Sequence, residues 1–295
     1  MYNKIKGSDF IMQEKYLYID REKAQSLLQD MRGMKPDKSG VNSKVWLTDG
    51  YAVLYSENLK VRNVTVPDSG LIFLEQLAVD LMELHRQGTG VIPILGFCCD
   101  DESGRGYIFQ PRAKGEELYH DRIMEKYYLQ RDRPCQPEDR AEQEYILART
   151  HFISQIPGEH FDKLIKDIIS IMNRDILIDF MGKSNFFYDK TAGFQFIDLN
   201  SHTDYRYGLT DSKPDSRLIC AYNGFVPCHI GAGSEVMPNM ILDENALTCL
   251  DSGEIESLKD DNRVIYEKCR AAMLHSGVSR EQLDTAMKLL KLFGV

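Results

Sequence analysis

The segment Ile176–Asn200, ILIDFMGKSNFFYDKTAGFQFIDLN, alternates short apolar runs with single polar residues. ILID, NFFYD and FQFID are typical of short strands, and the turn sequence DKTAG at 189–193 predicts a hairpin between the last two. Asp179, Asn185 and Asp198 then lie where these strands begin or end. Carboxylate and amide oxygens at such positions are the ligands of a magnesium-dependent phosphoryl-transfer site. The segment therefore predicts a metal-and-acid site.

The whole chain has the composition of an ordinary globular protein. Its 295 residues, 43% of them hydrophobic and 10% aromatic, are enough for one large domain or for two lobes with separate cores. The net charge of −9 argues against a nucleic-acid partner bound through phosphate neutralisation. The sequence gives no indication of oligomeric state.

The cysteines and the hydropathy pattern favour a cytoplasmic protein. No apolar run reaches the roughly 18 residues of a membrane span, and residues 1–20 lack the apolar core of a signal peptide, so we expect neither a membrane partner nor export. Seven cysteines without a CxxC pair are more typical of reduced thiols than of a disulfide framework.

Residues 1–112 are predicted to be rich in strands. Two strands at 44–47 and 51–55 flank the turn Thr48–Gly50, and apolar residues recur at helical spacing over 70–87. A helix is expected at 20–31, and VIPILGFCC (91–99) and RGYIFQPR (105–112) are expected to be strands.

Residues 113–295 are predicted to be mainly helical. The segment 113–150 is very polar and is expected to contain a helix, an exposed loop and the start of another helix, which favours a solvated insertion without a site of its own. Helices are expected at 145–154, 159–172, 255–274 and 279–292. The predicted fold is therefore α+β, with a small β-rich lobe at 1–112 and a helical lobe at 113–295 that contains the hairpin segment 176–200.

This order of elements, with the segment quoted above, resembles the protein kinase-like superfamily, including its aminoglycoside phosphotransferase-like members. The resemblance covers about residues 40 to 215 and is sharpest at 176–200. It implies a two-lobed kinase-like fold, with ATP and Mg²⁺ as cofactors and an acceptor hydroxyl on an unknown protein or small molecule.

The resemblance also implies roles for individual residues of the hairpin segment. Asp179 would accept or orient the proton of the acceptor hydroxyl, and Lys183 would contact the transferred phosphate. Asn185 and Asp198 would be the oxygen ligands of Mg²⁺.

In the small lobe the resemblance implies a nucleotide-binding set. Gly40 and Ser43 stand where the glycine-rich loop covers the phosphates. Glu75 stands on the helix whose glutamate normally pairs with a strand lysine. The lobe would end near Gln110, and the connector Pro111–Glu117 would offer backbone groups to adenine.

The chain departs from the family pattern at several of these positions. Asn185 is six positions after Asp179 instead of five, and Leu177-Ile178 replaces the histidine that usually precedes the aspartate. Tyr55 stands where the strand lysine is expected, with Lys44, Lys60 and Arg62 as nearby substitutes. These departures bear on whether catalysis persists.

Three interpretations are open from the sequence. The leading one is a magnesium-dependent kinase-like phosphotransferase. The second is a pseudokinase, catalytically weak or inactive, that serves as a nucleotide-binding or scaffolding module; Tyr55 and the single glycine of the loop favour it. In the third, the fold differs and the Asp/Asn cluster is ordinary loop chemistry.

Overall fold

The chain forms two compact units in the computed structural model. The first contains residues 1–113, with 174–176 and 200–208, and the second contains 114–173, 177–199 and 209–295. The sequence-based boundary lies after residue 112. The structure describes residues 11–12, 21–39, 43–56, 70–99, 106–118, 137–174, 176–178, 185–197, 199–201 and 249–281.

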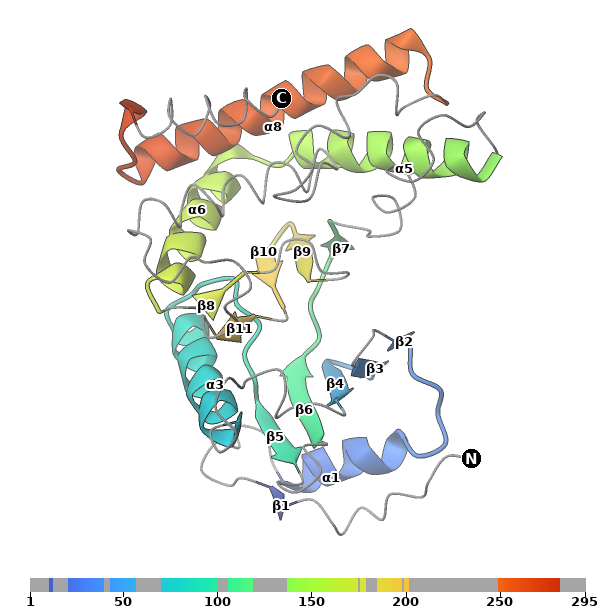
Figure 1. The fold of residues 1–295 in the computed structure, drawn as a ribbon, viewed down its shortest axis with the longest axis vertical. Helices are drawn as coiled ribbons and strands as arrows, with labels where there is room; N and C mark the ends of the chain where they lie inside the picture. The colour runs from blue at the N-terminus through green and yellow to red at the C-terminus, as the bar shows by residue number, and fades with distance from the viewer. Residues whose placement is uncertain are drawn as a thin grey trace. The chain divides into compact units, whose positions relative to one another are not determined.

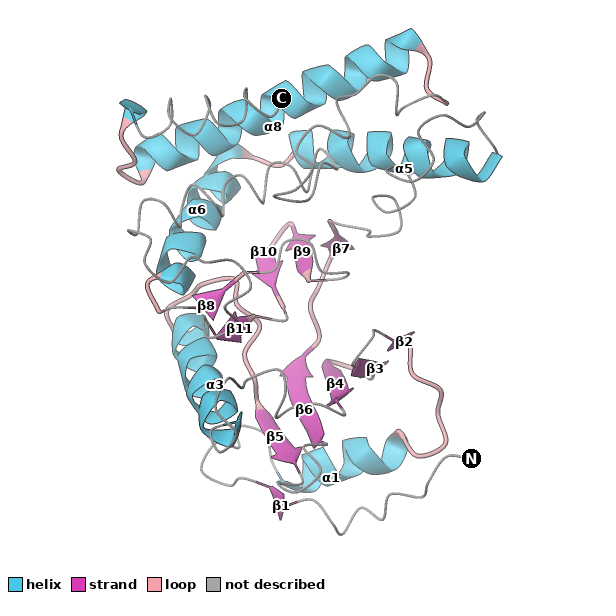
Figure 2. Cartoon of the chain, viewed as in Figure 1, coloured by secondary structure: helices cyan, strands magenta, loops and turns pink. Residues whose placement is uncertain are grey.

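The first unit is built on a six-stranded antiparallel sheet in the order β1-β5-β6-β4-β3-β2 (Figure 2). Its strands are β1 (Ile11–Met12), β2 (Lys38–Ser39), β3 (Ser43–Leu47), β4 (Tyr51–Ser56), β5 (Gly96–Cys99) and β6 (Gly106–Pro111). The predicted hairpin is confirmed, since β3 and β4 pair around a turn in which Gly50 has φ +82°. Such a φ suits glycine, which has no Cβ to clash.

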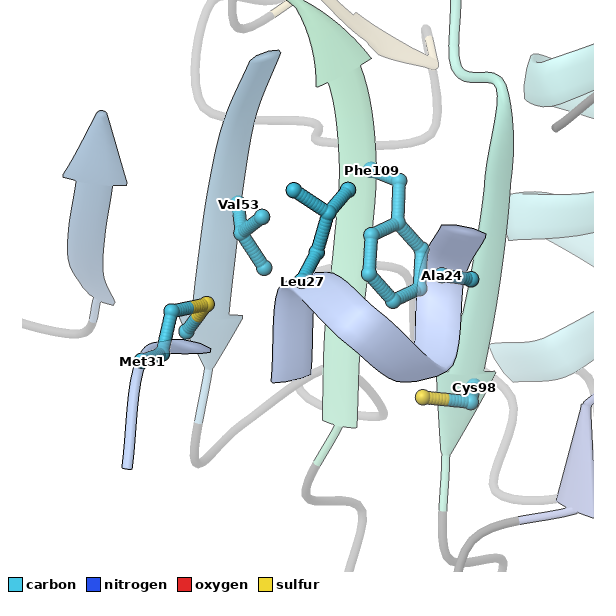
Figure 3. Packing of buried hydrophobic residues seen from close by; sticks show 6 residues of the cluster. All are labelled: Ala24, Leu27, Met31, Val53, Cys98 and Phe109. Atoms are coloured by element: carbon cyan, nitrogen blue, oxygen red, sulfur yellow. The ribbon is translucent and has the colours of Figure 1, made fainter. Parts of the chain in front are cut away.

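Helix α1 (Arg21–Asp30) covers one face of this sheet. Ala24, Leu27 and Met31 lie on one side of the helix because of their spacing, and they pack on Val53, Cys98 and Phe109 (Figure 3). All six are at most 7% exposed. Since side chains alternate along a strand, this packing defines which residues of β4 and β6 face α1.

The first unit also contains helix α3 (Gly70–Arg86), which confirms the predicted helix at 70–87. Two short strands, β8 (Ile176–Leu177) and β11 (Asn200–Ser201), pair with each other in a separate two-stranded sheet. Helix α3 contacts β11.

The second unit contains three long helices (Figure 1): α5 (Pro137–Ser154), α6 (Gly158–Met172) and α8 (Ser252–His275). Both α5 and α6 pack against α8. Helix α8 begins at a capping box in which Asp251 and Glu254 bond each other's backbone N–H. The break between α5 and α6 falls at Pro157, as the sequence predicted.

The described part of the second unit also contains a three-stranded sheet in the order β10-β9-β7. It consists of β7 (Glu116–Glu117), β9 (Phe186–Asp189) and β10 (Gly193–Phe196). Phe186, Phe194 and Phe196 are at most 2% exposed, and Phe161 of α6 meets the ring of Phe194 edge-on at 5.4 Å. These aromatic contacts attach the sheet to α6.

The structure corrects two predictions of local structure. VIPILGFCC was expected to be a strand throughout, but β5 covers only Gly96–Cys99, and Pro93 lacks the N–H that a ladder needs. The segment 113–150 was expected to be a solvated insertion that ends with the start of a helix. Helix α5, which begins at Pro137, confirms the helix start, but it buries Gln143 to 1% exposure. Its polar residues serve contacts with α8.

The cysteines differ in state. Cys98 and Cys269 are buried free thiols, and burial raises the pKa of Cys269. Cys249, however, is disulfide-bonded. The prediction of reduced thiols is therefore wrong for this residue, because spacing in the sequence does not show which sulfurs the fold brings together.

Among the helices that the structure describes, none combines the length and apolar content that a bilayer crossing requires.

The α1 packing gives a stability prediction for the first unit. Leu27→Ala removes a side chain that is 2% exposed and should lower the free energy of unfolding by about 2–5 kcal/mol. The control Gln25→Ala, on the exposed side of α1, should change it by less than about 0.5 kcal/mol. Urea unfolding can be followed through Trp46, the single tryptophan, which packs against this cluster. Equal losses in the two variants would contradict the packing.

Candidate functional site

The hairpin β9–β10 places Asn185 at its open end. The backbone carbonyl of Asn185 accepts a hydrogen bond from the N–H of Ile197 at 2.9 Å, and the residue is 8% exposed. Asn185 precedes β9, and Ile197 follows β10. The residues that flank the hairpin, Asn185 and Ile197, are therefore joined by a hydrogen bond, and Asn185 is one of the polar site residues predicted from the sequence.

The closed end of the hairpin is held by Asp189. Its Oδ1 accepts hydrogen bonds from the N–H groups of Ala192 and Thr191, both at 2.8 Å, and these bonds hold the pKa of Asp189 below its usual range. Gly193 has φ +77° at the exit of the turn. The turn predicted from DKTAG is thus confirmed, and its carboxylate serves the backbone.

Several predicted site residues lie outside the described ranges, namely Asp179, Lys183, Asp198 and Gly40. Ser43 lies on β3 opposite Ser56, and Glu75 lies on α3. Within the described ranges no three His, Cys, Asp or Glu side chains form a group that could hold a metal ion. The predicted magnesium ligands remain a prediction.

The register of β4 separates Tyr55 from Gln110. Tyr55 shares the α1 face with Val53, and its ring lies 5.1 Å from that of Tyr107. Gln110 is 5% exposed and pairs with Ala52, so it lies on the opposite face. On that face β4 presents Ala52, Leu54 and Ser56, none of which is cationic.

Lys44 also lies on the α1 face. It is the cross-strand partner of Tyr55, and its Nζ lies 5.8 Å from the centroid of that ring. Lys60 and Arg62, the other two substitutes considered from the sequence, lie outside the described residues. In the part of the sheet that the structure describes, the Gln110 face of β3 and β4 therefore carries no cationic side chain.

The connector after β6 is held by main-chain hydrogen bonds at both ends. The N–H of Arg112 donates to the carbonyl of Gly50 at 2.9 Å, and that of Leu118 donates to the carbonyl of Phe186 at 3.0 Å. Between these points, Gln195 of β10 bonds both backbone groups of Lys114. Its Nε2 donates to the Lys114 carbonyl at 2.8 Å, and its Oε1 accepts from the Lys114 N–H at 3.2 Å.

Gly115 passes close to the backbone of β9. It has φ +81°, and a Cβ added there would lie 2.1 Å from the backbone oxygen of Tyr188. Both observations require glycine, since L-residues disfavour this φ and no side chain fits the space.

An ion-pair cluster holds α3 within the first unit. Arg174, just before β8, contacts Asp80 at 3.2 Å and Glu83 at 2.9 Å. The hydrogen bond from Arg174 lowers the pKa of Glu83 and raises that of the guanidinium. The cluster joins the helix that carries Glu75 to the residues that lead into β8.

A groove of about 700 Å³ between α6 and α8 is separate from these residues. Its lining contains none of the site residues predicted from the sequence; it consists of Gly158, Glu159, Asp162, Arg263, Val264, Glu267, Lys268, Ala271 and His275.

Sequence reasoning missed Gln195, Gly115 and Arg174. A weak signal existed for the first two: Gln195 is the one polar residue in the strand FQF, and Gly115 interrupts the connector. Arg174 had no such signal, because its partners are 91 and 94 positions away.

Comparison with known proteins places the chain in no family. No protein-family model matches the sequence, and no curated protein matches it.

The tight approach at Gly115 gives a prediction. Gly115→Ala should destabilise the second unit by a few kcal/mol, because it adds an overlap with Tyr188 to the cost of the left-handed φ. Gly277→Ala is the control, since Gly277 has φ +89° but nothing within 4 Å of an added Cβ, and should cost only about 1–2 kcal/mol. Urea unfolding compares the two, and similar losses would contradict the close approach.

Proposed function

We propose that the chain is a kinase-like phosphotransferase with a two-lobed kinase-like fold, which moves the γ-phosphate of ATP to a hydroxyl of a protein or small-molecule acceptor in a magnesium-dependent reaction. The observation that carries this proposal is the open end of the β9–β10 hairpin. Asn185 and Ile197 are hydrogen-bonded there, and Asp198 follows Ile197 directly in the chain. One hairpin therefore supplies both proposed magnesium ligands.

The chemistry of these side chains fits the metal. Mg²⁺ prefers oxygen ligands and is usually bound in proteins by one or two side-chain oxygens together with phosphate oxygens. Asn185 and Asp198 offer an amide and a carboxylate oxygen. Magnesium bound there would neutralise charge on the β- and γ-phosphates.

The connector offers groups suited to adenine. Gln110 and Arg112 direct their main-chain groups toward β4, as the Ala52 pairing and the bond to Gly50 require. Because the direction alternates along an extended chain, the carbonyl of Pro111 and the N–H of Ala113 point away from β4. An acceptor and a donor on one edge complement the adjacent amine and ring nitrogen of adenine.

In the proposed reaction each residue has one task. The connector orients the base, Asn185 and Asp198 bind the metal, and Asp179 accepts the proton of the attacking hydroxyl. Lys183 contacts the transferred phosphate. Positioning of this kind, together with electrostatic stabilisation, is the main source of catalysis in phosphoryl transfer.

A pseudokinase is the second candidate, and the face of β4 favours it. Kinases hold the α- and β-phosphates with a strand lysine, whereas the Gln110 face of β4 presents Ala52, Leu54 and Ser56. A chain without this cation would bind nucleotide more weakly and transfer phosphate slowly or not at all.

Thermal unfolding with nucleotide tests the proposal. ATP with Mg²⁺ at 100 times its dissociation constant should stabilise the protein by about 2.7 kcal/mol. Asp198→Asn replaces the charged ligand by a neutral amide oxygen, and should weaken the magnesium-dependent part of this stabilisation and also slow ATP hydrolysis. Asp189→Asn, at the closed end of the same hairpin, is the matched control and should leave both unchanged.

The outcomes separate the candidates. Stabilisation with magnesium-dependent turnover supports the phosphotransferase, and stabilisation without turnover selects the pseudokinase. An unchanged melting temperature at millimolar ATP and Mg²⁺ would overturn both.

A further inference from the structure

Gln195 is a buried amide in an otherwise apolar strand. It is 5% exposed and lies between Phe194 and Phe196, which are 2% and 0% exposed. Burying an unpaired amide is unfavourable, so such a side chain persists where it has partners. Both of its polar atoms are used, one as donor to the carbonyl of Lys114 and one as acceptor from its N–H.

The two bonds fix the connector at one residue. The N–H of Lys114 belongs to the peptide unit that begins at Ala113, and its carbonyl belongs to the peptide unit that continues to Gly115. A side chain that bonds both groups therefore orients two consecutive peptide planes, much as a neighbouring strand would. The contact of Gly115 with Tyr188 limits the movement of the next residue.

Gln195, which makes both hydrogen bonds to Lys114, lies on the strand that leads to the proposed metal site. Gln195 lies three residues before Asp198, and β10 pairs residue by residue with β9, which Asn185 precedes. The strand that leads to the proposed magnesium ligand thus also holds the residue next to Ala113.

We infer that Gln195 is a positioning residue for nucleotide binding: by fixing both backbone groups of Lys114, its amide anchors the connector, whose preceding groups, the carbonyl of Pro111 and the N–H of Ala113, would bind a purine base. This inference rests on the proposed function. It predicts that loss of the two Gln195 hydrogen bonds should weaken the affinity for the base and leave the affinity for the phosphates and metal unchanged.

The test compares Gln195→Met with Gln143→Met. Methionine keeps the length and burial of Gln195 and removes both hydrogen bonds. Gln143 is a matched control, because it is 1% exposed and its Oε1 accepts from the backbone N–H of Cys249, away from the connector. Calorimetry on the full chain measures the affinities of two probes, adenosine and tripolyphosphate with Mg²⁺.

Gln195→Met should weaken adenosine binding about tenfold, the effect of losing roughly one net hydrogen bond, and should change tripolyphosphate binding less than twofold. Gln143→Met should bind both probes like the wild type. Hydrogen exchange should rise at residues 113–115 in Gln195→Met only.

Each other result overturns the inference. Unchanged adenosine affinity in Gln195→Met, with a wild type that binds both probes, overturns the positioning role and leaves the proposed function intact. An equal loss for both probes shows general disruption of the hairpin instead of base positioning. A wild type that binds neither probe overturns the proposed function and this inference together.

Discussion

The antiparallel pairing of β9 with both β10 and β7 is the constraint on which the second unit depends. β9 lies in the middle of its sheet, so its main-chain groups are used on both sides. The side of β9 that pairs with β10 brings Asn185 to Ile197. The side that pairs with β7 attaches the end of the connector and Leu118. A single four-residue strand therefore sets the position of a candidate ligand and of the chain entering the second unit.

Side-chain packing makes this small sheet rigid. Phe186 stacks on Phe194 with ring centroids 5.4 Å apart, and Phe196 lies 5.1 Å from Phe186. A two-stranded hairpin is marginally stable alone, and a further strand or packing against a helix stabilises it. The buried phenylalanines contribute this packing. Gln195 makes its polar contacts from between two of them on β10.

The first unit is constrained differently, through the alternation of side chains across its sheet. α1 covers the face that carries Val53 and Phe109, so Tyr55 and Lys44 are directed to the same side. The opposite face of β4 is left with small and aliphatic residues beside Gln110. This arrangement bears on the proposed function, because a phosphate-holding cation would have to lie on the face that a nucleotide contacts.

Local physics explains what could be predicted from the sequence. The turn at Asp189–Gly193, the helix at 70–87 and the break at Pro157 were all predicted correctly, because each depends on neighbouring residues and on periodicity. The extent of β5 and the burial of Gln143 on α5 were not, since pairing and packing with distant segments decide both.

By itself, the sequence determined the two hairpins, the helix at 70–87 and the polar residues near the ends of the second hairpin. Only the tertiary structure decided which face of β4 each side chain occupies and which residue holds the connector. The reason is distance along the chain: Gln195 and Lys114 are 81 positions apart, and no local pattern encodes that contact. Covalent geometry and side-chain periodicity act over a few residues, whereas a site assembled from separate strands depends on how the whole chain packs.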